Sequence, residues 1–170
     1  MKKHNGMRPQ DIVILLKIVL RNGHNWTGKE IAAQLQISAS EVSESLNRSV
    51  LAGLLMNDKR KVLKNALFEF IAYGLQYVFP TRPGAMVRGI PTSHSAFPLK
   101  NHINSDEVFV WAFTKGTVRG QSIETLYEKQ AIACQADTEL YEVLTLIDAI
   151  RIGRVREKTI ALELLKSKFV

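Results

Sequence analysis

Five polar residues lie on one face of a segment that has helical spacing, and their types suit contacts with nucleic acid. They are Ser40, Ser43, Glu44, Asn47 and Arg48. Serine and asparagine can hydrogen-bond to base edges or phosphates, glutamate can accept from the N4 amino group of cytosine, and arginine suits guanine. Because a carboxylate repels phosphates, such a helix would read sequence while contributing little of the affinity.

The cations that could supply affinity follow this segment. A polar turn at Asn57-Asp58 predicts a short hairpin that carries Lys59, Arg60 and Lys61, with Lys64 just beyond. A basic hairpin can lie along the phosphate backbone, where its cations release counterions and position a reading helix. Lys29 is expected to add a phosphate contact.

Three helices are predicted to hold these residues. Apolar residues recur at helical spacing from residue 12 onward. The predicted boundaries are Pro9 and Asn22-Gly23 for the first helix, Thr27 with Glu30 as a capping box for the second, and Ser38 or Ser40 to about Ala52 for the third. Ile37 falls at the turn between the second and third helices. Ser38 is also counted among the candidate DNA contacts.

The stretch "ISASEVSESLNRSVLAGLL" resembles the third helix of bacterial winged-helix regulators, the MarR-like group especially. The shared pattern is Ser-x-Ser-x-Val-Ser-x-x-Leu ending in Ala-Gly-Leu, and the resemblance covers about residues 9 to 64. It implies a winged helix-turn-helix that binds double-stranded DNA. Relatives commonly carry Arg or Lys where this chain has Glu44, which is a departure. The remainder resembles an uncharacterised group of bacterial winged-helix proteins.

The remaining residues predict a mixed region and then a helical hairpin. Asn65 is expected to cap a helix that ends at Gly74. Four prolines interrupt residues 77–105, which predicts an extended or looped layer there. The run "EVFVWAF" predicts a strand. Residues 126–170 predict two amphipathic helices that cover the core or pair with another chain.

The predicted fold class is therefore α+β and mainly helical. A winged helix-turn-helix domain at residues 1–64 is followed by a dimerisation or partner-binding region at 65–170. A small repeat, Val-Arg-Gly followed by Ile, occurs at residues 86–90 and 117–123, and coincidence is the better explanation of so short a match. Its arginines, Arg88 and Arg119, could bind an anion or be ordinary loop residues.

Charge is concentrated at the N-terminal end. Residues 1–64 hold 11 Lys/Arg against 5 Asp/Glu, which gives +6 of the chain's net +7. A localised basic surface attracts a polyanion. No apolar run is long enough for a membrane span, and the single cysteine, Cys134, fits a reducing compartment. A cytoplasmic location is expected.

The sequence offers no catalytic constellation. His4, His24, His94 and His102 lack metal-ligand spacing, and Ser93 and Ser95 are only sequence neighbours of His94. Neither a metal nor a cofactor is expected, and Cys134 predicts a small buried hydrophobe.

Three functional classes stay open. The leading one is a dimeric, sequence-specific regulator of transcription that binds double-stranded DNA. The second is a protein-interaction module, such as an antitoxin or a defence-system subunit, with a partner encoded nearby. The third is a regulator that senses a small molecule, if the proline-rich layer contains a pocket.

Overall fold

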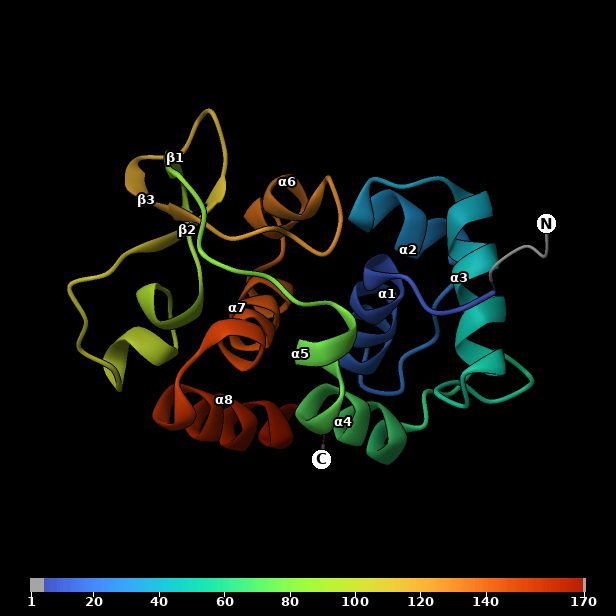
Figure 1. The fold of residues 1–170 in the computed structure, drawn as a ribbon. Helices are drawn as coiled ribbons and strands as arrows, with labels where there is room; N and C mark the ends of the chain where they lie inside the picture. The colour runs from blue at the N-terminus through green and yellow to red at the C-terminus, as the bar shows by residue number, and fades with distance from the viewer. Residues whose placement is uncertain (1–4, 170) are drawn as a thin grey trace. The chain divides into compact units, whose positions relative to one another are not determined.

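The computed structural model describes residues 5–169 and has an α+β fold dominated by helices (Figure 1). The chain divides into two compact units, the first extending to Leu67 and the second beginning at Phe68. None of the helices within the described residues is long and apolar enough to cross a membrane.

The first unit is built on three helices: α1 (Pro9–Leu20), α2 (Gly28–Leu35) and α3 (Ala39–Leu51). α1 is the core helix, because every residue from Asp11 to Leu16 is buried. α3 packs against both α1 and α2, as Figure 1 shows. The predicted start at Pro9 is confirmed, and the chain leaves α1 through Asn22 and Gly23, both with positive φ.

A minimal hairpin follows α3, as the sequence predicts. Leu55 and Val62 form an antiparallel bridge. The N–H of Met56 donates to the carbonyl of Lys61 at 3.0 Å, and the N–H of Leu63 donates to the carbonyl of Leu54 at 2.9 Å. These bonds fix the ends of the turn that carries the basic residues.

The helix predicted after the hairpin is present, but its predicted cap is wrong. α4 (Lys64–Tyr73) begins one residue before Asn65, so Asn65 lies inside the first turn and does not cap it. α4 ends before Gly74, as expected, and the chain continues into the one-turn helix α5 (Leu75–Val78).

A three-stranded sheet forms one part of the second unit: β1 (Met86–Pro91), β2 (Phe109–Ala112) and β3 (Val118–Ser122). β1 pairs antiparallel with both β2 and β3, and β2 and β3 share a short parallel pairing that closes the sheet on itself. β2 falls within the predicted strand. β1 lies inside the proline-rich stretch, which also contains the short 3-10 helices η1 (Ser93–Ser95) and η2 (Leu99–Asn101).

Three helices complete the second unit: α6 (Gln130–Gln135), α7 (Thr138–Ile152) and α8 (Val155–Lys168). Asp137 caps α7 as predicted, since its Oδ1 accepts from the N–H of Leu140 at 3.0 Å. α7 contacts α5, α6, α8 and η1 and is buried at every residue from Val143 to Arg151. Of the two predicted alternatives, α7 therefore follows the first and covers the core of the second unit.

A buried ionic network ties α7 to the sheet. Asp148 accepts hydrogen bonds from Thr92 Oγ1 at 2.7 Å and from Trp111 Nε1 at 2.6 Å, and its other oxygen pairs with Arg151 at 3.1 Å. Burial raises the pKa of Asp148, while the Arg151 guanidinium and the hydrogen bonds act against this shift. Both carboxylate oxygens of Asp148 accept hydrogen bonds, so the buried charge is satisfied. The network fixes α7 against β2 and Thr92 in the core of the second unit.

Candidate nucleic-acid interface

α2 and α3 each begin with a capping box. Thr27 Oγ1 accepts from the N–H of Glu30 at 3.2 Å, and the Glu30 carboxylate accepts from the N–H of Thr27 at 2.7 Å, so the predicted box is confirmed. Ser38 caps α3 in the same way with Glu41. Of the two predicted capping serines the structure selects Ser38, and Ser40 lies inside the helix.

Only three residues separate α2 from α3. Gln36 adopts the left-handed conformation that ends α2, Ile37 is half-buried, and Ser38 begins the next cap. This is the short connection typical of helix-turn-helix units. It fixes the angle at which α3 leaves α2.

One face of α3 is buried and the opposite face is open. Val42, Ser45, Leu46 and Ser49 are buried, whereas the four predicted readers Ser40, Ser43, Glu44 and Asn47 are exposed. Lys29 on α2 is exposed as well. The four readers therefore form a continuous polar surface, called the α3 face below.

Arg48 does not belong to the α3 face. Its Nε and Nη2 atoms donate to Asp11 Oδ2 and Oδ1 at 2.8 and 2.7 Å, and its side chain is only 11% exposed. The hydrogen bond to Asp11 raises the pKa of Arg48. The sequence places Arg48 toward a DNA groove, and that placement is corrected because a buried carboxylate 37 positions earlier holds the guanidinium.

The two glutamates have different roles. The Glu41 carboxylate is tied to the cap of α3, and the backbone hydrogen bond from Ser38 lowers the pKa of Glu41. Glu44 is half exposed, and its carboxylate lies 3.8 Å from Nη1 of Arg48. Glu41 is thus explained by helix capping, and Glu44 is the acid that the α3 face presents.

The hairpin and the first residue of α4, Lys64, carry the remaining predicted contacts. Arg60 and Lys61 are exposed, and Lys59 and Lys64 are half-buried. Asp58 Oδ1 accepts from the N–H of Arg60 at 2.9 Å, and Lys59 has a φ of 58°, so the turn is folded tightly around Asp58. Four cations and one carboxylate therefore share residues 57–64.

A pocket of about 480 Å³ lies beside these cations in the first unit. It is lined by Ile18, Val19, Asn22, Gly23, His24, Asn25, Trp26, Arg60, Lys61, Val62 and Lys64. The lining includes three cations and no carboxylate. The sequence predicts only a helix stop at Asn22-Gly23, and the position of these two residues beside the hairpin depends on the packing of α1.

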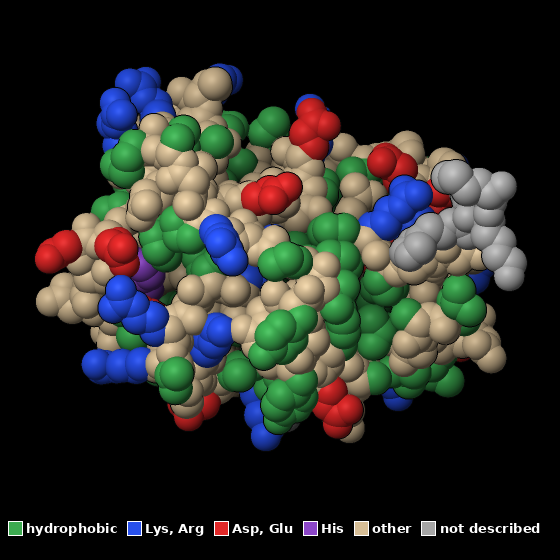
Figure 2. All heavy atoms as spheres, viewed as in Figure 1, with side chains coloured by type: hydrophobic (Ala, Val, Ile, Leu, Met, Phe, Trp, Pro, Cys, Tyr) green, Lys and Arg blue, Asp and Glu red, His purple; other side chains and the backbone are tan. Residues whose placement is uncertain are grey.

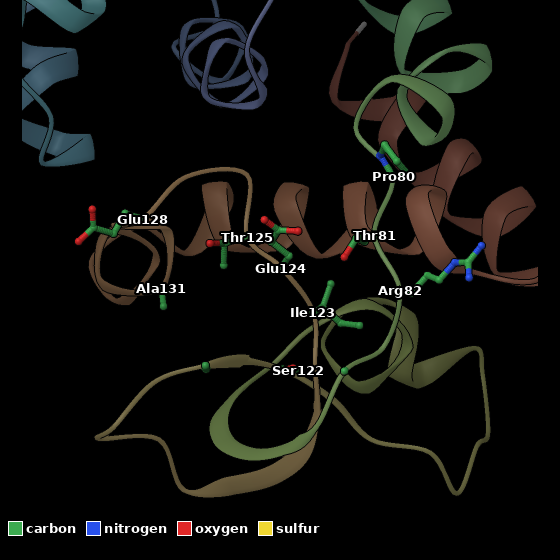
Figure 3. A pocket seen from close by; sticks show the side chains of 11 residues that line it. Pro80, Thr81, Arg82, Ser122, Ile123, Glu124, Thr125, Glu128 and Ala131 are labelled. Atoms are coloured by element: carbon green, nitrogen blue, oxygen red, sulfur yellow. The ribbon is translucent and has the colours of Figure 1, made fainter.

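The second unit has its own cavity of about 570 Å³, between the segment 80–84 and residues 122–131. In Figure 3, Arg82 and Glu128 extend from opposite ends of its lining, and Thr81 and Glu124 lie between them. Arg151 donates to the carbonyls of Phe79, next to Pro80, at 3.0 Å and of Glu124 at 2.9 Å, and so links the two lining segments. The proline-rich segment therefore borders a cavity.

Two of the residues considered for enzymatic chemistry, His94 and Ser95, make structural hydrogen bonds. His94 is buried, with Nε2 2.8 Å from the carbonyl of Glu107, and Ser95 Oγ accepts from the N–H of Phe109 at 2.9 Å. Cys134 is buried. Within residues 5–169, no group of three or more His, Cys, Asp or Glu side chains is placed to hold a metal ion. His4 lies outside the described residues.

Comparison with protein-family models, with curated proteins and with solved structures gave no match.

Proposed function

We propose that the first unit is a winged helix-turn-helix that binds double-stranded DNA, and that the chain regulates transcription. The observation that carries this proposal is the pairing, in one compact unit, of an exposed polar helix face with a cationic hairpin. The α3 face would enter the major groove, where Ser40, Ser43 and Asn47 can hydrogen-bond to base edges.

The hairpin would supply most of the affinity. Without Arg48, the α3 face carries no cation, and Glu44 adds a negative charge. Lys59, Arg60, Lys61 and Lys64 therefore carry the contacts with the phosphate backbone, together with Lys29 on α2. The proposal divides the interface into a helix that specifies sequence and a hairpin that holds the duplex.

A dimer is part of the proposal, since two copies of α3 about one duplex turn apart would read a near-palindromic site. Because α7 is buried within the second unit, the contact between the two copies of a dimer would use other surfaces. Tyr73 and Tyr77 are 76% and 75% exposed and offer an apolar surface for it. Location in the cytoplasm, where such a regulator would act, is proposed with it.

The test is fluorescence anisotropy of the full chain with the DNA upstream of its own gene and with a scrambled duplex, at several salt concentrations. Tighter binding to the upstream duplex with a steep salt dependence on both supports a sequence-specific regulator. Absence of binding at about 50 mM salt, where phosphate contacts are strongest, would overturn the proposal.

A protein-interaction role is the second candidate, and the exposed carboxylate of Glu44 favours it. A helix face with an acid and no free cation is compatible with a basic protein surface. Affinity purification of the tagged chain, with a Glu44→Lys variant as control, would support this role if a partner encoded nearby were lost from the variant.

A further inference from the structure

The two Val-Arg-Gly segments are neighbours in the sheet. β1 and β3 pair antiparallel, and their register places Arg88 directly opposite Arg119. Residues opposite each other in an antiparallel pair point to the same face of the sheet. Both arginines are exposed. The short repeat in the sequence therefore places two exposed arginine side chains at opposite positions on one face of the sheet.

The glycine after each arginine explains why the arginines face outward. A Cβ on Gly89 would lie 1.9 Å from the carbonyl oxygen of Trp111, and a Cβ on Gly120 would lie 2.5 Å from that of Val108. The backbone at β2 thus occupies the space on the glycine face. Because successive residues of a strand point to opposite faces, Arg88 and Arg119 are directed away from β2.

This arrangement concentrates positive charge that the sheet does not neutralise. Like charges directly opposite each other destabilise a strand pair. Residues 70–105 and 108–123, which include all three strands, contain no aspartate or glutamate. Among the ion pairs of the described residues, none includes Arg88 or Arg119.

A third cation belongs to the same end of the sheet. The N–H of Phe113 donates to the carbonyl of Arg88 at 3.0 Å, and this bond starts the turn that carries exposed Lys115. In Figure 2, Lys and Arg side chains gather at the upper left, over the strands that Figure 1 labels β1 and β3. The surface formed by Arg88, Lys115 and Arg119 is called the arginine pair site.

We propose that the arginine pair site binds a phosphate oxyanion. Guanidinium groups present planar forks of N–H donors that match phosphate oxygens two at a time. An anion between Arg88 and Arg119 would convert their mutual repulsion into two favourable contacts. The phosphate could belong to a free phosphorylated molecule or to a nucleic-acid backbone. The site lies wholly in the second unit and is independent of the α3 face.

The test uses the full chain and inorganic phosphate at constant ionic strength, followed by NMR of the arginine Nε–H groups and backbone amides. Saturable shifts at Arg88 and Arg119 are expected. Arg88→Gln and Arg119→Gln should each weaken phosphate binding by about tenfold or more, since a hydrogen bond to a charged group is lost. Arg156→Gln, an exposed arginine on α8, is the control and should leave phosphate binding unchanged.

A second titration with a short DNA duplex separates the two sources. Shifts at the same two arginines with duplex at far lower concentration would identify a nucleic-acid backbone, whereas a response to phosphate alone would identify a free phosphorylated molecule. Either result supports the site. Equal phosphate responses in all three variants, or no saturable shift with either probe up to about 50 mM phosphate, would overturn it.

Removing one arginine also has an effect that a merely structural role would not produce. In phosphate-free buffer of low ionic strength, Arg119→Gln should raise the melting temperature, because repulsion from Arg88 is relieved. Added phosphate should then raise the melting temperature of the wild-type chain more than that of the variant. A fall in the variant's melting temperature without phosphate would show that the pair stabilises the sheet by itself and would contradict the proposal.

Discussion

Arg48 on α3 donates two hydrogen bonds to Asp11 on α1, at 2.8 and 2.7 Å, and the Asp11 side chain is fully buried. Asp11 Oδ2 also accepts from the N–H of Arg8 at 2.8 Å, at the start of α1. The pair therefore joins the first turn of α1 to the last turn of α3 and helps to fix the orientation of the α3 face.

Breaking this pair should destabilise the first unit. Arg48→Met leaves a buried carboxylate without its partner, and we expect the free energy of unfolding to fall by about 3 kcal/mol. Urea denaturation measures it. The double variant Asp11→Leu/Arg48→Met should lose less than the single variant, because no charge remains buried. If the double variant lost the sum of the two single-variant free-energy losses, a direct interaction between Asp11 and Arg48 would be contradicted. The control is Glu44→Gln on the exposed face, which should change the free energy of unfolding by less than about 0.5 kcal/mol.

Neutralising the hairpin should weaken binding to every duplex. In the triple variant Lys59→Gln/Arg60→Gln/Lys61→Gln, up to three phosphate contacts are lost, so the slope of log K against log salt should flatten by up to about 2.7. Anisotropy at four salt concentrations measures the slope. The matched control is Arg154→Gln/Arg156→Gln/Lys166→Gln, three exposed cations of the second unit with the same change in net charge. If both triple variants lost the same affinity for DNA and the same salt slope, the net charge of the chain and not the position of the hairpin cations would explain binding.

Changing a reader on the α3 face should alter specificity and leave the salt slope intact. Asn47→Ala removes a side chain able to pair with adenine, and discrimination at one base pair should fall by about 1–3 kcal/mol. Selection from a randomised duplex pool measures it. Gln34→Ala, an exposed amide on α2, serves as the comparison. An unchanged preference for every base in Asn47→Ala would remove Asn47 from the interface.

The Ser38–Glu41 cap predicts a pH dependence. The pKa of Glu41 is lowered in the folded chain from 4.5, so its charged form contributes stability above about pH 4.5. That contribution is lost as the pH falls through the folded-state pKa. The difference in free energy of unfolding between wild type and Glu41→Gln should therefore be largest near pH 6 and shrink toward pH 3. A difference that stays constant over this range would show that the charge of Glu41 does not matter to the cap.

The close approach of β2 to β1 should make Gly89 intolerant of any side chain. Gly89→Ala places a Cβ 1.9 Å from a backbone oxygen that cannot move away without breaking strand pairing, and a loss above about 2 kcal/mol is expected. Gly28→Ala at the start of α2 is the control, because its Cβ would make an ordinary contact at 3.8 Å and alanine favours the helix. Chemical denaturation of both variants measures the contrast, and equal stability would refute the tight β1–β2 packing.

The sequence by itself determined the features that depend on neighbours within about four residues. The Thr27–Glu30 box, the cap at Asp137 and the stop at Asn22-Gly23 are set by side chains and backbone groups of the same turn, and the structure confirms each. The period of apolar residues likewise fixed which face of α3 is buried. Local signals failed at Asn65, where a possible capping residue lies just inside α4.

Only the tertiary structure decided which distant residues meet. Arg48 has the type and spacing of a DNA contact, and the sequence cannot reveal that Asp11, 37 positions away, is buried beneath it. The register that places Arg88 against Arg119 depends on how β1 and β3 pack around β2, and two short matching segments do not specify that pairing. The burial of α7 on all sides follows from the elements that surround it, because an apolar stripe shows that a helix needs cover without showing what provides it.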